Sequence, residues 1–340
     1  MKLIAGLLVG AILRTTQVAG APSTWVVCPP GATDTICQYT GNQGIQAAVD
    51  HASDGDTISI RPGTYAPDGF RDIPYKESTI RGYVVVENKD LSLVGEAGTV
   101  LDGTNGQPAS GVVVNGGQLT VKNLTLRNFR AASPQDNIYD GHGLFFIDAG
   151  VTVSNVTIES IDKMALTERG NSTVDAANIR ILDGQVGIWL EESSHLRLRN
   201  SVIRDNQSAG ICAYSNSSAN IYNSVFDGNQ DDGIYSEGEA AIYVTNSIIM
   251  GNKPYGIRAI GNSRIAARHS ILFANQRNST ASKSNRLVRL GPDILEVDPR
   301  VDGDYKPLQG SPVTTNGDPE VRNSDGSRSK IGLRDDPGKK

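Results

Sequence analysis

The sequence predicts an all-β fold, a solenoid of parallel strands whose coils have a repeat of about 22–23 residues. Three series of residues, all in phase with this repeat, predict the fold. The first is a series of asparagines, which His269 continues one repeat later: Asn155, Asn178, Asn200, Asn223 and Asn246. The second consists of Gly-Ile pairs with the same spacing, which begin at Gly187, Gly210, Gly233 and Gly256. The third is another asparagine series with that spacing: Asn206, Asn229, Asn252 and Asn275. Periods of this length are typical of architectures in which each coil stacks on the next.

Each repeat contains two or three short runs, such as SVIRD at 201–205 and GIYS at 233–236, separated by Gly and Asn. Such runs favour strands, and the repeat leaves no room for a helix. Because stacked strands lie about 4.8 Å apart, residues of equal phase form lines along the axis. We expect the asparagines in turns, where their amides hydrogen-bond from coil to coil. His269 is expected to be a turn residue of the same line and not a ligand.

Both ends of the chain are predicted to close the solenoid. Residues 42–56 carry apolar residues at a helical spacing and precede the strand TISI, which predicts a short amphipathic helix over the open N-terminal coil. Cys28 and Cys37 are predicted to form a local disulfide. Residues 22–290 are thus assigned to the β-helix with its N-terminal cap. Residues 291–340, rich in Gly, Pro and Asp, are assigned to an irregular C-terminal cap with a disordered tail.

Residues 1–21 have the pattern of a cleaved secretory signal: Lys2, an apolar core at 3–13 and an Ala-Gly-Ala cleavage site. The apolar run is too short to span a bilayer. We therefore expect a secreted or periplasmic protein without a membrane span. The net charge of -5 argues against nucleic acid as a partner, and we expect a monomer.

Two stretches carry a resemblance to a known family. The segment GIQAAVDHASDGDTISIRPGTY, followed by coils of the type NSxIxxN…GI, resembles the right-handed parallel β-helix proteins of the pectate-lyase-like superfamily. The closing pattern DP…DY…SP…GDP…DGSRSKIG is similar to the C-terminal segment of secreted, largely uncharacterised members. The resemblance covers roughly residues 40–332 and implies a right-handed coil. For function it implies polysaccharide lyases, hydrolases and epimerases, together with proteins of unknown substrate.

The phase of the Gly-Ile strands predicts which side chains leave the core. If the isoleucines of these pairs point inward, the first and the third residue after each isoleucine point outward. The outward set combines aromatic rings, which stack on sugar rings, with acids and guanidinium groups, which bind hydroxyls and carboxylates. The residues predicted to bind a polysaccharide are Phe145, Trp189, Glu191, Tyr214, Tyr235, Glu237 and Arg258. The alternative is a set of solvated residues on an ordinary sheet surface.

Two irregular stretches are predicted to border this face. The coil from Asn123 to Asn155 is 32 residues long, and its excess lies near 131–143. Insertions in solenoids become loops on one face, which is often the binding face. The second stretch, 66–82, is a candidate wall of the groove or a plain surface loop, with three cations: Arg71, Lys76 and Arg81.

The residues near the insertion suit β-elimination in a uronic-acid polymer. This reaction needs a positive charge against the carboxylate, a base for the C5 proton and an acid for the leaving oxygen. Lys163 or His142 is the candidate base, Arg169 the candidate for charge neutralisation and Tyr139 the candidate acid. An epimerase needs the same groups on both sides of C5.

A calcium ion is a further candidate, with Asp136 and Asp140 as its ligands. A hydrolase would instead use two carboxylates. Glu191 and Glu237 lie two coils apart, roughly 9–10 Å from the strand spacing, near the range for inverting enzymes.

We therefore expect an exported enzyme that acts on a uronate-containing polysaccharide as a lyase or C5-epimerase. A non-catalytic cell-surface or periplasmic carbohydrate-binding solenoid is the alternative, and a glycoside hydrolase the third option. The adjacent acids Asp231 and Asp232 fall between an asparagine and a Gly-Ile pair of the repeat, and we expect them in a surface turn.

Overall fold

The computed structural model of this chain describes residues 21–104, 106–132, 139–281, 286–323 and 325–334. Residues 1–20 of the predicted signal peptide, Asp136 and residues 335–340 of the predicted tail lie outside the described residues.

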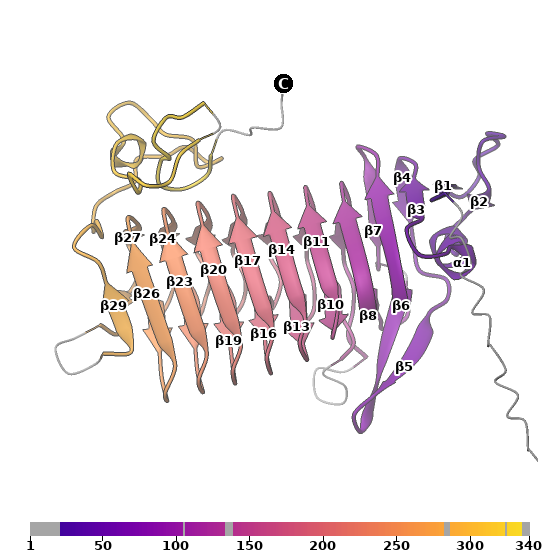
Figure 1. Ribbon diagram of the computed structural model, residues 1–340, viewed down its shortest axis with the longest axis horizontal. Helices are drawn as coiled ribbons and strands as arrows, with labels where there is room; N and C mark the ends of the chain where they lie inside the picture. The colour runs from indigo at the N-terminus through magenta and orange to yellow at the C-terminus, as the bar shows by residue number, and fades with distance from the viewer. Residues whose placement is uncertain (1–20, 105, 133–138, 282–285, 324, 335–340) are drawn as a thin grey trace, which may run out of the picture.

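The described residues form the predicted parallel β-helix, with three strands in each complete coil (Figure 1). We call its three sides the first, second and third face. The first face contains β10 (Leu144–Ile147), β13 (Met164–Arg169), β16 (Val186–Leu190), β19 (Ile211–Ala213), β22 (Ile234–Ser236), β25 (Tyr255–Ala259) and β28 (Arg277–Ser279). The second face contains β11 (Gly150–Ser154), β14 (Thr173–Ala177), β17 (His195–Arg199), β20 (Ser218–Tyr222), β23 (Ala241–Thr245), β26 (Arg264–Arg268) and β29 (Val288–Leu290). The third face contains β4 (Gly63–Tyr65), β7 (Thr99–Asp102), β9 (Thr125–Arg127), β12 (Thr157–Glu159), β15 (Arg180–Leu182), β18 (Val202–Arg204), β21 (Val225–Asp227), β24 (Ile248–Met250) and β27 (Ile271–Phe273). Two long strands, β6 (Ser78–Gly95) and β8 (Ser110–Lys122), run through both the first and the second face.

The first asparagine series occupies the sharp turn between the second and third faces. Each of its residues has a left-handed backbone, with φ between 46° and 55°, and His269 takes the same position as predicted. Asparagine tolerates this conformation better than most residues, which explains its recurrence. The amides hydrogen-bond from coil to coil: Asn178 Nδ2 donates to Asn155 Oδ1 at 3.2 Å, and Asn200 Nδ2 to Asn178 Oδ1 at 2.6 Å.

The second asparagine series lies inside the solenoid, between the third and first faces. Asn206 donates to Asn229 at 2.8 Å, Asn229 to Asn252 at 2.8 Å and Asn252 to Asn275 at 3.0 Å. The core beside it is built from lines of apolar residues, among which the four isoleucines of the Gly-Ile pairs are fully buried. Both predicted ladders are therefore confirmed as structural devices of the coil.

Helix α1 (Gly44–His51) covers the N-terminal coil, within the predicted range but shorter. Its apolar side packs into the core, and Gln46 accepts from Val85 N at 2.7 Å and donates to Val85 O at 3.1 Å. These bonds satisfy backbone groups of a strand that has no further coil on this side. The predicted disulfide between Cys28 and Cys37 is present. It joins β1 (Thr24–Cys28), which pairs with β2 (Tyr39–Thr40) and β3 (Thr57–Ile60), to the loop that follows.

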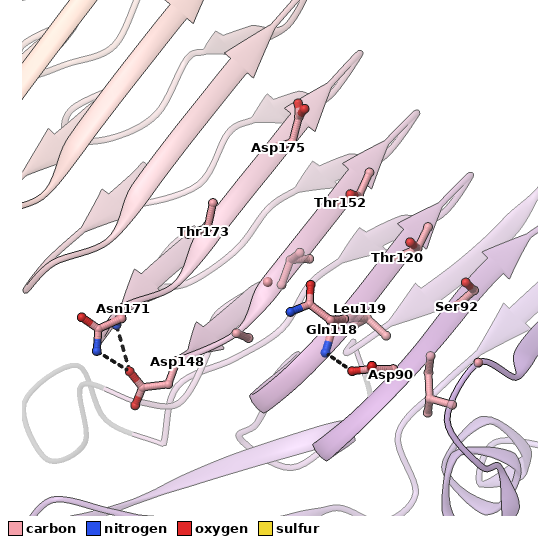
Figure 2. Close-up of a pocket in the computed structure, with 15 residues that line it drawn as sticks. Asp90, Ser92, Gln118, Leu119, Thr120, Asp148, Thr152, Asn171, Thr173 and Asp175 are labelled. Carbon is pink, nitrogen blue, oxygen red and sulfur yellow. Dashed lines mark hydrogen bonds between the residues drawn. The ribbon is translucent and has the colours of Figure 1, made fainter. Parts of the chain in front are cut away.

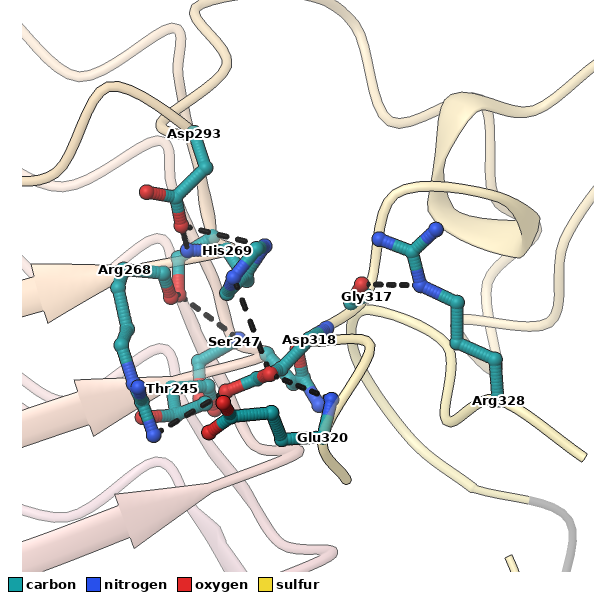
Figure 3. Close-up of polar contacts among 11 residues, drawn as sticks. Thr245, Ser247, Arg268, His269, Asp293, Gly317, Asp318, Glu320 and Arg328 are labelled. Atoms are coloured by element: carbon teal, nitrogen blue, oxygen red, sulfur yellow. Dashed lines mark hydrogen bonds and ion pairs between the residues drawn. The ribbon is translucent and has the colours of Figure 1, made fainter. Parts of the chain in front are cut away.

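The segment after residue 291 is irregular, as predicted, with one short 3₁₀ helix, η1 (Pro312–Thr314). It packs against the third face, where Val313 and Ile331 cover an apolar line of strand residues: Val202, Val225, Ile248 and Ile271. Figure 3 shows the turn at which it is attached: His269 lies between Asp293 (3.2 Å) and Asp318 (3.9 Å). Its described part thus lies on a flank of the solenoid.

Candidate functional site

Side chains of the first face that point away from the core form two lines along the axis. The strand register joins Phe145, Thr167, Trp189, Cys212, Tyr235 and Arg258 in the first line. The second line, two residues further along each strand, contains Ile147, Arg169, Glu191, Tyr214, Glu237 and Ile260. None of these residues belongs to the central core, so the phase of the repeat sorts inward from outward side chains as predicted.

A hairpin lies across the N-terminal part of this face. It is formed by β5 (Arg71–Tyr75) and the antiparallel start of β6, and we call its residues 71–82 the hairpin wall. Ile73 and Ile80 pack on the outward side of Phe145, which is fully buried. This contact corrects the prediction that the ring of Phe145 is exposed: the hairpin occupies the side on which a sugar would stack.

The tip of the hairpin wall reaches the opposite edge of the face. Lys76 forms an ion pair with Glu192, which lies in the turn after β16 and whose second oxygen accepts from Gly170 N at 2.5 Å. Tyr75 contacts the ring of Tyr139 edge-on, with a centroid distance of 5.4 Å. The predicted wall is therefore present, and Lys76 is the cation that anchors it.

Three of the four predicted catalytic residues meet beneath this tip. The ring of His142 stacks on Phe145 at 4.8 Å, and its Nδ1 lies 2.7 Å from Thr167 Oγ1. The ring of Tyr139 also stacks on Phe145, and the guanidinium of Arg169 lies 5.3 Å from the centroid of Tyr139. We call Tyr139, His142 and Arg169 the inner cluster.

Lys163 lies one coil from His142, as predicted: its backbone N–H donates to Gly141 O at 3.0 Å. His142, Lys163 and Arg169 are only 2, 5 and 6% exposed. They are covered because the hairpin wall and Tyr139 pack over this part of the face. The guanidinium of Arg169 forms an ion pair with Glu191, whose side chain is partly exposed, at 2.7 Å from Nη2 to Oε2.

Beyond the hairpin wall, three rings form a continuous row from strand to strand. Trp189 lies 4.4 Å from Tyr214, and Tyr214 lies 5.8 Å from Tyr235, measured between ring centroids. We call Trp189, Tyr214 and Tyr235 the aromatic row. Tyr235 is only 8% exposed and lies 4.9 Å from the guanidinium of Arg258, which corrects the prediction that its ring is open to solvent. A carboxylate accepts a hydrogen bond at each end of it: Glu191 from Trp189 Nε1 at 3.1 Å, and Glu237 from the hydroxyl of Tyr235 at 2.7 Å.

Asp232 belongs to this face, which corrects the expectation that it lies in a surface turn. It is 1% exposed, accepts from Tyr255 N at 3.2 Å and lies 2.5 Å from Arg258 Nε. Burial raises the pKa of Asp232 to about 6, although the neighbouring guanidinium opposes the shift. Asp232 lies two residues before the isoleucine of a Gly-Ile pair, and the equivalent residues Val186 and Ala209 pack with the aromatic row. The repeat therefore already indicated that Asp232 lies on the first face.

Residues 110–275 match the family model described as "Right handed beta helix region". The chain therefore has a right-handed β-helix fold. This β-helix protein is similar to the crystal structure of pectate lyase Pel9A, with a TM-score of 0.54 and 14% identity over 92% of this chain and 96% of that one.

Two further solved structures resemble this β-helix protein at lower scores. The A-module of mannuronan C-5 epimerase AlgE4 from Azotobacter vinelandii has a TM-score of 0.48 and 17% identity over 73% of this chain and 69% of that one. Pectin methylesterase PemA from Erwinia chrysanthemi has a TM-score of 0.45 and 12% identity over 79% of this chain and 93% of that one. No curated protein matches in sequence. At these identities the similarity concerns the fold.

The second face of the β-helix protein carries a separate polar groove of about 630 Å³ (Figure 2). Hydroxyls from successive strands line it at Ser92, Thr120 and Thr152. No aromatic side chain is among its lining residues, and its carboxylates Asp90 and Asp148 accept backbone N–H groups at 2.8 Å from Gln118 and Asn171. This face therefore offers a matched surface for control variants.

The predicted calcium ligands are Asp136, outside the described residues, and Asp140, which is 3% exposed. Within the described ranges, no three His, Cys, Asp or Glu side chains lie close enough together to hold a metal ion. Calcium binding stays a prediction.

The same part of the chain contains no helix that is long and apolar enough to cross a membrane.

Proposed function

We propose that this β-helix protein is an exported enzyme that binds a uronate-containing polysaccharide along its first face and cleaves or epimerises it by β-elimination chemistry. The aromatic row is the observation that carries this proposal. Its rings follow one another along the axis and end at the Arg169–Glu191 pair. Rings stack on the apolar sides of sugars, and the flanking acids and guanidinium groups suit sugar hydroxyls and carboxylates.

The elimination requires four balanced changes at one sugar unit. A base takes the C5 proton, a double bond forms between C4 and C5, the C4–O bond breaks, and an acid gives a proton to the leaving oxygen. Arg169 is assigned to the uronate carboxylate, since its guanidinium already binds a carboxylate, that of Glu191. Tyr139, partly exposed and beside Arg169, is the assigned acid, and His142 or Lys163 the assigned base.

The support for this assignment is the convergence of residues from separate elements. Tyr139 and His142 precede β10, while Arg169 ends β13, and Thr167 fixes the ring of His142 through its hydroxyl. A fixed ring orientation is what a general base needs. An epimerase would return the proton to the other side of C5 instead of breaking the C4–O bond.

A second candidate function, glycoside hydrolysis, is favoured by one specific observation. The pKa of Asp232, raised by burial to about 6, keeps this carboxyl group protonated in mildly acidic solution, as a general acid requires. Glu237, on the same coil and bonded to Tyr235, is the carboxylate that would activate water. The two reactions differ in product: elimination gives an unsaturated sugar, and hydrolysis gives none.

The test is incubation with polygalacturonate, alginate and a neutral pectic polymer, while ultraviolet absorbance and new reducing ends are measured together. The proposal expects both signals to rise on a polyuronate, or a changed uronate composition for an epimerase. It expects the Arg169→Gln variant to lose at least 100-fold in rate, on the order of a lost charge-stabilising group. Arg197→Gln, on the exposed second face, is the matched control and keeps full rate. Reducing ends without absorbance would favour hydrolysis, and binding without any product would favour the non-catalytic solenoid.

A further inference from the structure

The second outward line of the first face is covered at one end and open beyond it, whereas Cys212 and Tyr235 of the first outward line are 6 and 8% exposed. Along the second outward line, Ile147 and Arg169 are 3 and 6% exposed, Glu191 has a 28% exposed side chain, and Ile260 is 38% exposed. Exposure thus begins at the coil of β16. The change coincides with the position of the hairpin wall.

The hairpin wall crosses the whole width of the face. It leaves the solenoid at Gly82, where β6 begins to pair with β8 at the start of the first face. Its middle packs on Val113, Phe145 and Ile147 of the next coils. Its tip is fixed by the ion pair of Lys76 to Glu192, which lies past the end of β16 at the opposite edge. Figure 1 shows the hairpin projecting at the lower edge of the solenoid, below β8.

The aromatic row runs directly toward this obstacle. Trp189 is its last ring, and Glu192 lies three residues further along the same coil. Tyr75 and Tyr139 contact one another edge-on beside Arg169 and fill the space where the row would otherwise continue. A chain of sugar units stacked on the rings therefore meets protein immediately after Trp189.

From this geometry we infer that a sugar chain on the aromatic row is stopped at the hairpin wall, so that the protein receives a free end of a polysaccharide chain and not an internal stretch. The inference rests on the proposed function, because it assumes that the aromatic row binds the polymer. It assigns a specificity role to Tyr75 and Lys76: these residues exclude the sugar units that would extend past the hairpin wall. Products formed where the aromatic row ends, at the Arg169–Glu191 pair, are then short and come from one end of the chain.

The first experiment uses oligogalacturonate and oligomannuronate that carry a bulky dye at the reducing end, at the non-reducing end or at both. Binding is measured by fluorescence anisotropy, or by competition with unlabelled chains. We expect a block at one end to weaken binding at least tenfold, a block at the other end to leave it unchanged, and a double block to weaken it. Equal binding of unblocked chains, of chains blocked at either single end and of doubly blocked chains overturns the inference. If neither oligosaccharide binds in any form, the proposed function itself fails, and the inference falls with it.

A double variant at the tip of the hairpin wall provides a second test of the inference. The Tyr75→Ala/Lys76→Ala double variant removes the tip but keeps Ile73 and Ile80 over Phe145, so the covered apolar cluster stays covered. We expect it to accept doubly blocked chains and, where the wild type turns over polymer, to change from one short product to a ladder of internal fragments. Lys122→Ala, on the exposed outward side of the second face, is the control and keeps the wild-type pattern. A wild-type enzyme that produces internal fragments from the outset contradicts the inference even if binding and activity are strong.

Discussion

Replacement of Glu168 by leucine is expected to stabilise the solenoid, because this carboxyl group lies in its apolar core. Glu168 is fully buried in β13, in register with Phe146 on one neighbouring strand and Leu190 on the other. Neither of its carboxyl oxygens has a hydrogen-bond partner among the described residues. Burial therefore raises the pKa of Glu168 well above its usual value, and the native side chain holds its proton where the unfolded one has lost it.

Two contributions set the size of the effect. A buried polar group without a partner costs about 1–3 kcal/mol in protein mutational data, and leucine removes that cost. The second contribution depends on pH. Because the pKa of Glu168 is raised in the folded state, the unfolding free energy of the wild type is highest below the unfolded pKa of about 4.3. It falls by about 1.4 kcal/mol per pH unit above that value, until pH passes the folded pKa. The Glu168→Gln variant cannot titrate but keeps a buried amide, and it separates the two contributions.

The assay is urea unfolding of the wild type and both variants, followed by circular dichroism at about pH 5 and about pH 8. Glu168→Leu is expected to raise the unfolding free energy by about 1–3 kcal/mol at the lower pH and by more at the higher one. Glu168→Gln is expected to gain about 1 kcal/mol at the lower pH, where the wild type has begun to lose stability, and more at the higher one. The reasoning is refuted if the leucine variant is no more stable than the wild type at pH 8, or if the same pH slope persists in the glutamine variant.

Three further outcomes are expected. Asn229→Ala removes a fully buried amide that hydrogen-bonds to both neighbouring coils, so the unfolding free energy should fall by on the order of 3 kcal/mol. The control Asn216→Ala, at the surface, should change it by less than about 0.5 kcal/mol. Equal effects of the two variants would contradict a structural role for the buried asparagine series. Reduction of the disulfide between Cys28 and Cys37, which are 9 residues apart, should cost about 2–3 kcal/mol in thermal unfolding, and an unchanged melting temperature would argue against it. Difference titration between the wild type and Asp232→Asn should show one proton released with a midpoint of about 6; a midpoint near 4 would mean that the carboxyl group is solvated.

Much of the fold could be predicted because the coil repeats. The constant repeat length places the Gly-Ile pairs, both asparagine series and the outward lines in one frame, and the structure keeps that frame. The same frame could also have identified Glu168, since it lies between Thr167 and Arg169, which the repeat places in the two outward lines. Alternation along a strand leaves the residue between them no direction but inward.

Contacts outside the repeat could not be predicted in the same way. The hairpin wall lies on Phe145 and reaches Glu192, 116 residues from Lys76, and no periodic signal links these positions. The flank covered by the C-terminal segment did leave a trace in the sequence. Each strand that this segment covers carries two consecutive apolar residues, such as Val225 and Phe226, where an exposed face would alternate with polar ones.

Fluorescence titration of Trp189 tests most directly whether the first face binds polysaccharide. The chain has two tryptophans, and Trp25 lies in β1 at the N-terminal end. Oligogalacturonate is expected to change the emission of the wild type, and Trp189→Ala to abolish that change. By competition, Trp189→Ala or Tyr214→Ala should bind about tenfold more weakly, equivalent to about 1.4 kcal/mol. Tyr243→Ala, an exposed ring on the second face, should bind as the wild type does. Equal affinities for all three variants and the wild type would contradict binding along the aromatic row.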